Sequence, residues 1–217
     1  MTLVEVDTPH GRANAHLRPA DEPRAALVLG HGAGGGVAAR DLVAVAGIAL
    51  SQGISVALVE QPYRVAGRRS PAPAHQLDTA WIAVVEQLRE GELRGLPLLV
   101  GGRSSGARVA CRTAAATGAV GVLCLAFPLQ PPRRAEAAPA PSRLPELVAL
   151  TVPMLIVQGV RDPFGMPPGG AHREVVQVQG DHSLRTDLQT VAVAVGAWLS
   201  DVVASTAKPQ ASTTDRL

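Results

Sequence analysis

An apolar run that leads directly into a glycine–serine pentapeptide constrains the fold of this chain more than any other feature. Residues 96–101 (Leu-Pro-Leu-Leu-Val-Gly) are followed at once by Gly102-Arg103-Ser104-Ser105-Gly106, and then by a helix-forming stretch. A strand, a G-x-S-x-G turn and a helix, in this order, are typical of the sharp turn called a nucleophile elbow. Glycine is favoured two residues before and after the serine because so tight a turn leaves little room for side chains. We therefore predict that the Ser104 hydroxyl projects from the end of a sheet.

The rest of the chain alternates short apolar runs with amphipathic stretches of helical period. The apolar runs predict eight strands, at residues 3–7, 13–17, 25–29, 55–60, 98–101, 120–126, 154–158 and 174–179. The amphipathic stretches predict helices at residues 38–51, 75–89, 105–117 and 184–203. Strands that are apolar along their whole length, alternating with helices, indicate a parallel sheet covered on both faces. We therefore predict an α/β protein with a mostly parallel, eight-stranded sheet.

The length of 217 residues fits one domain of ordinary size. We expect this domain to span residues 1–203 and the Ser/Thr/Lys/Pro segment 204–217 to be a disordered tail. The Pro- and Ala-rich segment 130–145 is too short for a separate lid, so an open site is expected. Residues 42–59 carry no charge, but Ser51-Gln52-Gly53 interrupts them, which favours a helix followed by a strand over a membrane span.

Charge and composition narrow the class of partner. With 20 Lys and Arg against 18 Asp and Glu, the net charge of +2 does not indicate a nucleic-acid surface. Residues 1–10 show no secretory signal, so a cytoplasmic protein is expected. Cys111 and Cys124 lie in apolar surroundings and are predicted to be buried free thiols. No Cys, His or carboxylate cluster has the spacing of a metal site, and we expect neither a metal nor another cofactor.

A serine hydroxyl becomes a good nucleophile only when a base takes its proton and a third group orients that base. Asp162 follows the predicted strand 154–158, and His182 follows the predicted strand 174–179. The carboxyl ends of parallel strands meet at one edge of a sheet, so both side chains are expected near Ser104. Asp162 could instead only form a turn, and His182 could simply face solvent. Asp181 is a rival acid and His172 a rival base, although His172 precedes its strand and would lie at the wrong end of the sheet.

Acyl transfer also needs two backbone donors for the oxyanion. One donor is expected to be the N–H of Ser105, at the start of the helix after the nucleophile. The other is expected from the loop His31–Gly36, where glycines allow a close approach to substrate, and Ala33 is our choice. A phosphate-binding loop is the alternative interpretation of these glycines, but no Gly-Lys-Ser/Thr follows them and Lys208 is the only lysine.

Taken together, these motifs resemble a known family. The matching segments are residues 30–35 (Gly-His-Gly-Ala-Gly-Gly), 101–106, 127–129 (Phe-Pro-Leu), 158–165 and 180–184. They resemble the small, lidless α/β-hydrolases akin to dienelactone hydrolase, and among these the branch with the testis-expressed hydrolase-like proteins and a subunit of a histone-acetyltransferase complex. The resemblance covers residues 25–203 and implies the α/β-hydrolase fold without a lid domain. This chain has Ser104 where dienelactone hydrolase has cysteine, and Gln130 where relatives often have histidine.

Substrate contacts are predicted from the same segments and from the arginines near them. We expect Gly32, Arg103 and Phe127 to contact the substrate. Arg64, Arg68 and Arg69, after the fourth strand, either attract an anionic substrate or face solvent.

The function expected from the sequence is hydrolysis of a small-molecule carboxylic ester or thioester through an acyl-enzyme on Ser104, with Asp162 and His182 activating the serine. A peptidase using the same residues is an alternative within the enzymes. A non-catalytic interaction module on the same fold is an alternative outside them. No nucleic-acid or membrane partner is expected, and the sequence leaves the oligomeric state open.

Overall fold

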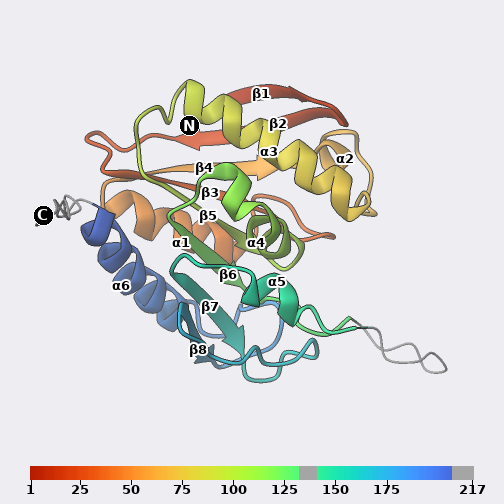
Figure 1. The fold of residues 1–217 in the computed structure, drawn as a ribbon, viewed down its shortest axis with the longest axis vertical. Helices are drawn as coiled ribbons and strands as arrows, with labels where there is room; N and C mark the ends of the chain where they lie inside the picture. Colours follow the sequence, from red (N-terminus) through yellow and green to blue (C-terminus); the bar gives the residue numbers. More distant parts are fainter. Residues whose placement is uncertain (132–140, 207–217) are drawn as a thin grey trace, which may run out of the picture.

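The computed structural model describes residues 1–131 and 141–206 and contains one eight-stranded sheet (Figure 1). The strands are β1 (Thr2–Thr8), β2 (Gly11–Arg18), β3 (Ala25–Gly30), β4 (Ile54–Glu60), β5 (Leu98–Arg103), β6 (Gly121–Leu125), β7 (Met154–Gly159) and β8 (Arg173–Val178). The helices are α1 (Arg40–Ser51), α2 (Pro62–Val65), α3 (Ala74–Glu90), α4 (Ser105–Thr117), α5 (Leu144–Val148) and α6 (Leu188–Thr206).

The order of the strands in the sheet is β1-β2-β4-β3-β5-β6-β7-β8. Strand β2 pairs antiparallel with both β1 and β4, and every pair from β4 to β8 is parallel. The prediction of an eight-stranded, mostly parallel sheet is confirmed. The parallel strands end at one edge, so the loops after β3, β5, β6, β7 and β8 gather there.

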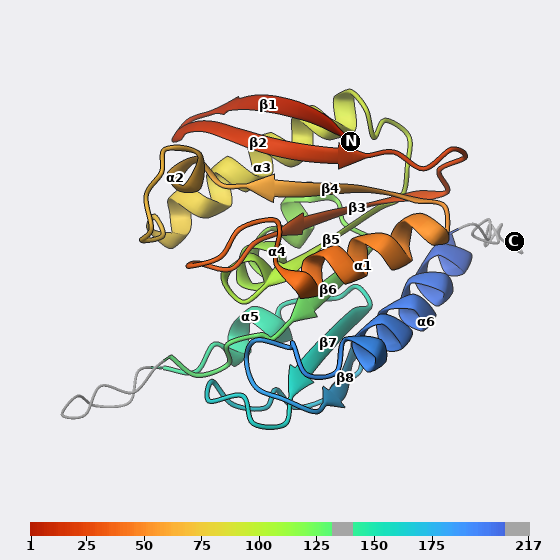
Figure 2. The same ribbon diagram turned by 180° about the vertical axis from the view of Figure 1, so that it is seen from behind.

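Two helical layers cover the two faces of the sheet. Helices α3 and α4 lie on one face (Figure 1), and α1 and α6 lie on the other (Figure 2). Along β3, Ala26 and Val28 belong to the core under α3 and α4, whereas Leu27 and Leu29 belong to the core under α1 and α6. Because alternate residues of a strand point to opposite faces and both faces are buried, the central strands are apolar throughout.

The closing helix differs from its prediction at both ends. It begins at Leu188, four residues later than expected, because Leu184 is buried in the left-handed conformation (φ 49°), which a right-handed helix cannot include. It ends at Thr206, three residues into the predicted tail, and the rest of that tail, 207–217, lies outside the described residues. The short helices α2 and α5 were not predicted, because four or five residues carry too little periodicity to detect.

The two segments with membrane-like composition are elements of this fold. Residues 42–59 divide into α1 and β4, with Gly53 turning the chain between them at φ 69°. In the part of the chain that the structure describes, α6 is the one helix long and apolar enough to cross a membrane, judged by length and composition only. Its inner side chains pack into the core beside α1.

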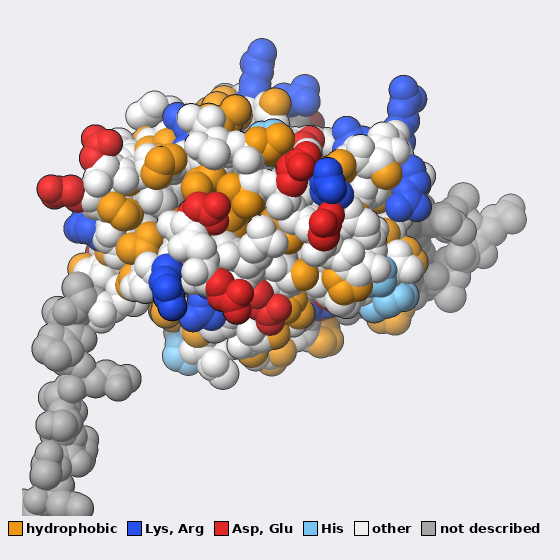
Figure 3. All heavy atoms as spheres, turned by 90° about the horizontal axis from the view of Figure 1, so that it is seen from above, with side chains coloured by type: hydrophobic (Ala, Val, Ile, Leu, Met, Phe, Trp, Pro, Cys, Tyr) orange, Lys and Arg blue, Asp and Glu red, His pale blue; other side chains and the backbone are white. Residues whose placement is uncertain are grey.

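The two cysteines are buried and free, as predicted, and the surface carries charges of both signs. Cys111 on α4 and Cys124 on β6 are buried free thiols whose sulfur atoms lie 3.4 Å apart. Their mutual hydrogen bond and burial raise the pKa of Cys124. On the face of the molecule seen in Figure 3, acidic and basic side chains are interspersed with hydrophobic and uncharged ones.

Candidate active site

The turn after β5 holds Ser104 in a strained conformation. Its backbone has φ 52° and ψ −108°, and non-glycine residues rarely adopt a positive φ. The Ser104 N–H donates to the Leu125 carbonyl at 2.9 Å, and the first turn of α4 begins at once with the Arg108 N–H donating to the Ser104 carbonyl at 3.2 Å. Local strain of this kind persists only where the surroundings fix it, and it clusters at functional sites.

Glycines at the elbow allow β3 to pass close beside it. A methyl group on Gly102 would lie 2.5 Å from the Gly30 carbonyl oxygen. A methyl on Gly106 would lie 2.5 Å from the Gly30 carbonyl carbon and 2.9 Å from the His31 oxygen. The two glycines of the G-x-S-x-G motif are therefore required by the close approach of a neighbouring strand as well as by the turn itself.

Three side chains from three loops form a hydrogen-bonded series. The Ser104 hydroxyl lies 2.9 Å from His182 Nε2, and His182 Nδ1 lies 2.7 Å from Asp162 Oδ2. The Asp162 side chain is 1% exposed and that of His182 19% exposed. The loops after β5, β7 and β8 thus bring together the residues that the sequence had placed at the ends of these strands.

Asp162 is itself held by neighbours that the sequence did not reveal. Gln158 Nε2 donates to Asp162 Oδ2 at 2.8 Å, and the Phe164 N–H donates to Oδ1 at 2.9 Å. The same Gln158 nitrogen also lies within hydrogen-bond distance of the Phe127 and Gly165 carbonyls. The ring of Phe164 packs against that of His182, with centroids 4.4 Å apart. These contacts fix the carboxylate from one side and the imidazole from the other.

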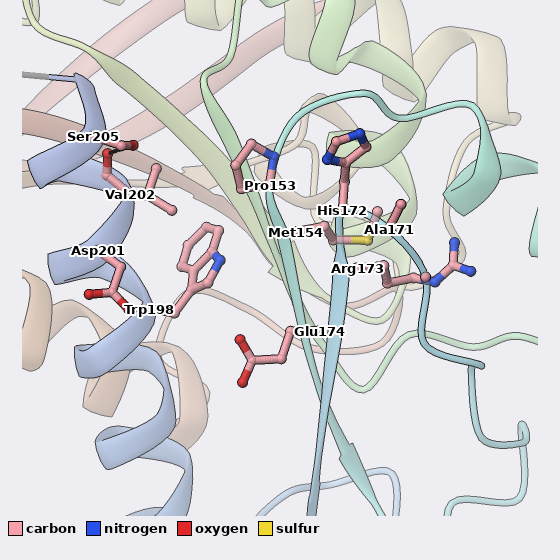
Figure 4. A pocket seen from close by; sticks show the side chains of 11 residues that line it. Pro153, Met154, Ala171, His172, Arg173, Glu174, Trp198, Asp201, Val202 and Ser205 are labelled. Carbon is pink, nitrogen blue, oxygen red and sulfur yellow. Dashed lines mark hydrogen bonds between the residues drawn. The ribbon is translucent and has the colours of Figure 1, made fainter. Parts of the chain in front are cut away.

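The alternative acid, Asp181, and the alternative base, His172, lie elsewhere. The exposed Asp181 accepts hydrogen bonds from the Ser183 hydroxyl and N–H, and these bonds lower the pKa of its carboxyl. His172 lies before β8, at the opposite end of the sheet from Ser104, where Figure 4 shows it on the wall of another cavity. Neither residue is placed to act on the Ser104 hydroxyl.

The loop after β3 lies against the nucleophile. A methyl on Gly32 would lie 3.6 Å from Ser104 Cβ, so this backbone passes directly beside the serine. The N–H groups of Ala33 and Ser105, the two predicted oxyanion donors, have no hydrogen-bond partner among the described residues. Both are free to donate to a ligand at Ser104, and their role stays a prediction.

Two side chains support this loop. His31 Nδ1 lies 2.8 Å from the Gly32 carbonyl, while His31 Nε2 accepts the Gln61 N–H at 3.2 Å. Only the neutral imidazole protonated on Nδ1 satisfies both bonds, and burial lowers the pKa of His31 accordingly. The Tyr63 hydroxyl donates to the Ala33 carbonyl at 2.9 Å, and burial raises the pKa of Tyr63. Because the Gly32 carbonyl and the Ala33 N–H belong to one peptide unit, fixing the first orients the second.

Arg103, the residue before the nucleophile, makes two specific contacts. Its Nε donates to Asp41 Oδ2 at 2.9 Å, and its Nη2 donates to the His182 carbonyl at 2.8 Å. Burial raises the pKa of Asp41, and the charge of Arg103 partly offsets this effect. The partners lie 62 and 79 positions from Arg103 in the sequence, so no local pattern could have indicated them.

The predicted substrate contacts have different outcomes. A methyl on Gly32 would lie 3.1 Å from Arg103 Nη1 and 3.6 Å from Ser104 Cβ, and contact of Gly32 and Arg103 with a substrate stays a prediction. The prediction for Phe127 is wrong, because its side chain is fully buried in the core under α3 and α4. Ala126, with φ 51°, turns the chain so that the ring points inward. Arg68 and Arg69 are exposed, Arg64 is half-buried, and Arg64 Nη1 donates to the Arg68 carbonyl.

The cavity next to this site is small and polar. It has a volume of 240 Å³ and is lined by the loop after β3, the start of α1, and the side chains of Arg103, Ser183 and Arg185. A larger cavity of 540 Å³ lies at the other end of the sheet, between β8 and α6, with Trp198, Glu174 and Asp201 on its walls (Figure 4). We assign the site to the small cavity because its walls include Arg103 and Ser183, the chain neighbours of Ser104 and His182. Among residues 1–131 and 141–206, no group of three His, Cys, Asp or Glu side chains is placed to hold a metal ion.

A mostly parallel eight-stranded sheet, with a serine on the strained turn after β5 and an acid and a histidine after β7 and β8, defines an α/β-hydrolase. A family model described as an alpha/beta hydrolase domain matches residues 23–198, and the chain belongs to this family.

Solved structures show the same fold. A lidless α/β serine hydrolase from Xanthomonas campestris superposes with a TM-score of 0.73 at 18% identity, covering 92% of this chain and 94% of that one. Est1E from Butyrivibrio proteoclasticus gives 0.75 at 17% identity, covering 94% and 100%. A dienelactone hydrolase from Anabaena variabilis gives 0.71 at 15% identity, covering 92% and 96%. No curated protein sequence matches the chain.

Proposed function

We propose that this α/β-hydrolase is a serine hydrolase that cleaves a carboxylic ester or thioester through an acyl-enzyme on Ser104. The observation that carries the proposal is the continuous series from the Ser104 hydroxyl to His182 Nε2 (2.9 Å) and from His182 Nδ1 to Asp162 (2.7 Å). This is the arrangement in which a histidine can take the serine proton while a carboxylate stabilises the imidazolium that forms.

In the first half-reaction, Ser104 Oγ attacks the acyl carbon while His182 Nε2 takes its proton. The carbonyl oxygen becomes an oxyanion, which accepts hydrogen bonds from the Ala33 and Ser105 N–H groups. As the intermediate collapses, the bond to the leaving group breaks, and the alcohol or thiol leaves with the proton from His182. The acyl group remains as an ester on Ser104.

In the second half-reaction, a water molecule takes the place of the leaving group. His182 accepts a proton from this water as its oxygen attacks the acyl carbon, and the same two N–H groups hold the second oxyanion. Collapse breaks the ester bond to Ser104, which regains its proton from His182, and the carboxylic acid is released.

The architecture favours small or extended substrates over long lipids. In the part of the chain that the structure describes, no lid domain covers the site, and the adjacent cavity of 240 Å³ is polar. Est1E, one of the structural neighbours, has been solved with ferulic acid bound, so esters of ferulic acid and of related hydroxycinnamic acids belong in a first substrate panel. The Gly-His-Gly-Ala-Gly-Gly, G-x-S-x-G and Phe-Pro-Leu motifs also support placing the chain in the branch with the testis-expressed hydrolase-like proteins.

Labelling with a fluorophosphonate tests the proposal, because this probe reacts with activated serines. We expect one modified peptide, carrying the label on Ser104, and no label in Ser104→Ala. Ser51→Ala, which changes an exposed serine at the end of α1, serves as the matched control and is expected to label like the wild type. Absence of labelling and of activity on 4-nitrophenyl esters and thioesters, in protein shown to be folded, would overturn the proposal and favour the interaction module.

A further inference from the structure

We propose that Arg103 and Asp41 are positioning residues that hold the backbone of His182 at a fixed position relative to the Ser104 hydroxyl. The inference rests on the proposed function only for its catalytic readout, because the geometry itself can be tested separately. The G-x-S-x-G motif leaves the residue before the serine unspecified, and the chemistry described above does not use Asp41.

The elbow contacts His182 at two points rather than one. Ser104 Oγ lies 2.9 Å from the imidazole, and the adjacent residue donates from Arg103 Nη2 to the His182 carbonyl at 2.8 Å. One contact fixes the ring and the other fixes the backbone that carries it. Since the two elbow residues are consecutive, the hydrogen bond from the Arg103 guanidinium opposes a shift of the His182 backbone relative to the serine, provided that the guanidinium is itself held in place.

The loop that carries His182 needs such an anchor. It follows β8, which is the last strand of the sheet and has a neighbour on one side only. Asp162 holds the imidazole through Nδ1, but a bond to a ring nitrogen leaves the backbone free to shift about the side-chain torsions. Fixing both the ring and the carbonyl removes that freedom.

Asp41 fixes the guanidinium in turn. Its Oδ2 accepts from Arg103 Nε at 2.9 Å, its Oδ1 accepts the Leu42 N–H at 3.0 Å, and its side chain is 2% exposed. A guanidinium is a rigid planar fork, so a partner at Nε determines where Nη2 points. Asp41 lies in the first turn of α1, which packs on the sheet. Through Asp41 and Arg103, this helix therefore fixes the position of the His182 loop.

A displaced base is costly for catalysis. A misplacement of about 1 Å can cost roughly 100-fold in rate. We therefore expect Arg103→Ala to lower kcat for a 4-nitrophenyl ester by about 10- to 100-fold while KM changes much less. Asp41→Asn keeps an oxygen that can accept from Nε but loses the charge, so a smaller loss is expected from that variant.

The decisive experiment is chemical rescue. Arg103 lines the 240 Å³ cavity, so its removal leaves a space that a small cation can enter. We expect millimolar guanidinium to restore kcat of Arg103→Ala along a saturating curve, and tetramethylammonium, which donates no hydrogen bond, to restore nothing. Arg103→Lys can reach one partner but not both, and should fall between Arg103→Ala and the wild type.

Arg112→Ala is the matched control. Its side chain is 20% exposed against 18% for Arg103, and it also pairs with an aspartate, Asp78, at 2.6 Å. This pair joins α4 to α3, away from the site. The control is expected to lose stability without losing kcat and to show no response to guanidinium.

A readout independent of turnover separates this inference from the proposed function. In ¹⁵N-histidine-labelled protein, the His182 Nδ1–H bonded to Asp162 should give a slowly exchanging proton signal that broadens in Arg103→Ala and returns with guanidinium. If the wild type neither hydrolyses esters nor labels, the proposed function fails and this signal still decides the inference. If Arg103→Ala does not fold, Arg103→Lys and Asp41→Asn carry the same test. Unchanged kcat, or an unchanged His182 signal in a folded variant, overturns the positioning role.

Discussion

Adding one methyl group at Gly106 should damage both the fold and the site, because this glycine lies where the elbow meets the end of β3. A Cβ there would lie 2.5 Å from the Gly30 carbonyl carbon and 2.9 Å from the His31 oxygen, whereas ordinary contact begins at 3.4 Å. The first distance falls short by 0.9 Å, and the obstacles are backbone atoms that cannot rotate away. In Gly106→Ala, the end of β3 must therefore move by about 1 Å.

The size of the effect follows from this displacement. Overpacking of a well-packed region costs about 1–3 kcal/mol, and the better helix propensity of alanine returns at most about 1 kcal/mol at the second residue of α4. A net loss of roughly 1–2 kcal/mol corresponds to a Tm lower by about 2–8 °C for a domain of this size. The moving strand carries the Ala33 loop, so kcat should also fall by about 10- to 100-fold.

Urea denaturation gives the free energy of unfolding, and ester hydrolysis gives kcat. Gly47→Ala is the matched control, because Gly47 is exposed in the middle of α1 and a methyl there meets nothing within 4 Å. That variant should gain up to about 1 kcal/mol from helix propensity and keep its activity. A Gly106→Ala protein with the stability and kcat of the wild type would refute the close approach of β3 to the elbow.

Three further variants test other parts of the site. Asp162→Asn should lower kcat by roughly 10³- to 10⁴-fold with little change in Tm, because the amide cannot stabilise the His182 imidazolium; steady-state kinetics with calorimetry checks this. Ser104→Gly should raise the free energy of unfolding by about 1 kcal/mol in urea, because glycine adopts the strained backbone of Ser104 without cost. Burial lowers the pKa of His31 below its unfolded value of about 6.5. As the pH falls from about 7, His31 is therefore protonated in the unfolded chain before it is protonated in the folded one, and the free energy of unfolding decreases. His31→Asn, which keeps a donor for the Gly32 carbonyl but does not titrate, should therefore show a smaller loss of unfolding free energy between about pH 7 and 5 than the wild type.

The sequence predicted the sheet and the proximity of the serine, the acid and the histidine because both leave local signals. Strands buried on two faces are continuous apolar runs, and the carboxyl ends of parallel strands place Ser104, Asp162 and His182 at one edge whatever the details of packing. The supporting contacts leave no such signal. Nothing near Arg103 in the sequence indicates that its partners are Asp41 and the His182 carbonyl, which pack against it only in the folded protein.

Phe127 shows why proximity in sequence to a motif is a poor guide to side-chain direction. It follows β6 at the edge where the site lies, yet its ring is fully buried. The direction is decided by Ala126, whose positive φ turns the chain inward, and an alanine is not a residue from which a left-handed conformation can be predicted. Gln158 escaped prediction for a related reason, since a glutamine inside an apolar strand shows its role only when its acceptors are known.

Backbone strain in the described residues is concentrated around the site. The three non-glycine residues with positive φ there are Ser104, Ala126 and Leu184, which lie at the elbow, after β6 and two residues beyond His182. Each such conformation costs about 1–3 kcal/mol, so it must be fixed by interactions made elsewhere. Ala126 and Leu184 are fully buried in the core under α1 and α6, and the Ala126 N–H donates to the Val157 carbonyl at 2.9 Å. The core beneath the sheet edge therefore holds the loops in conformations that they would not adopt alone, and the distances between serine, histidine and aspartate depend on that packing as much as on the side chains themselves.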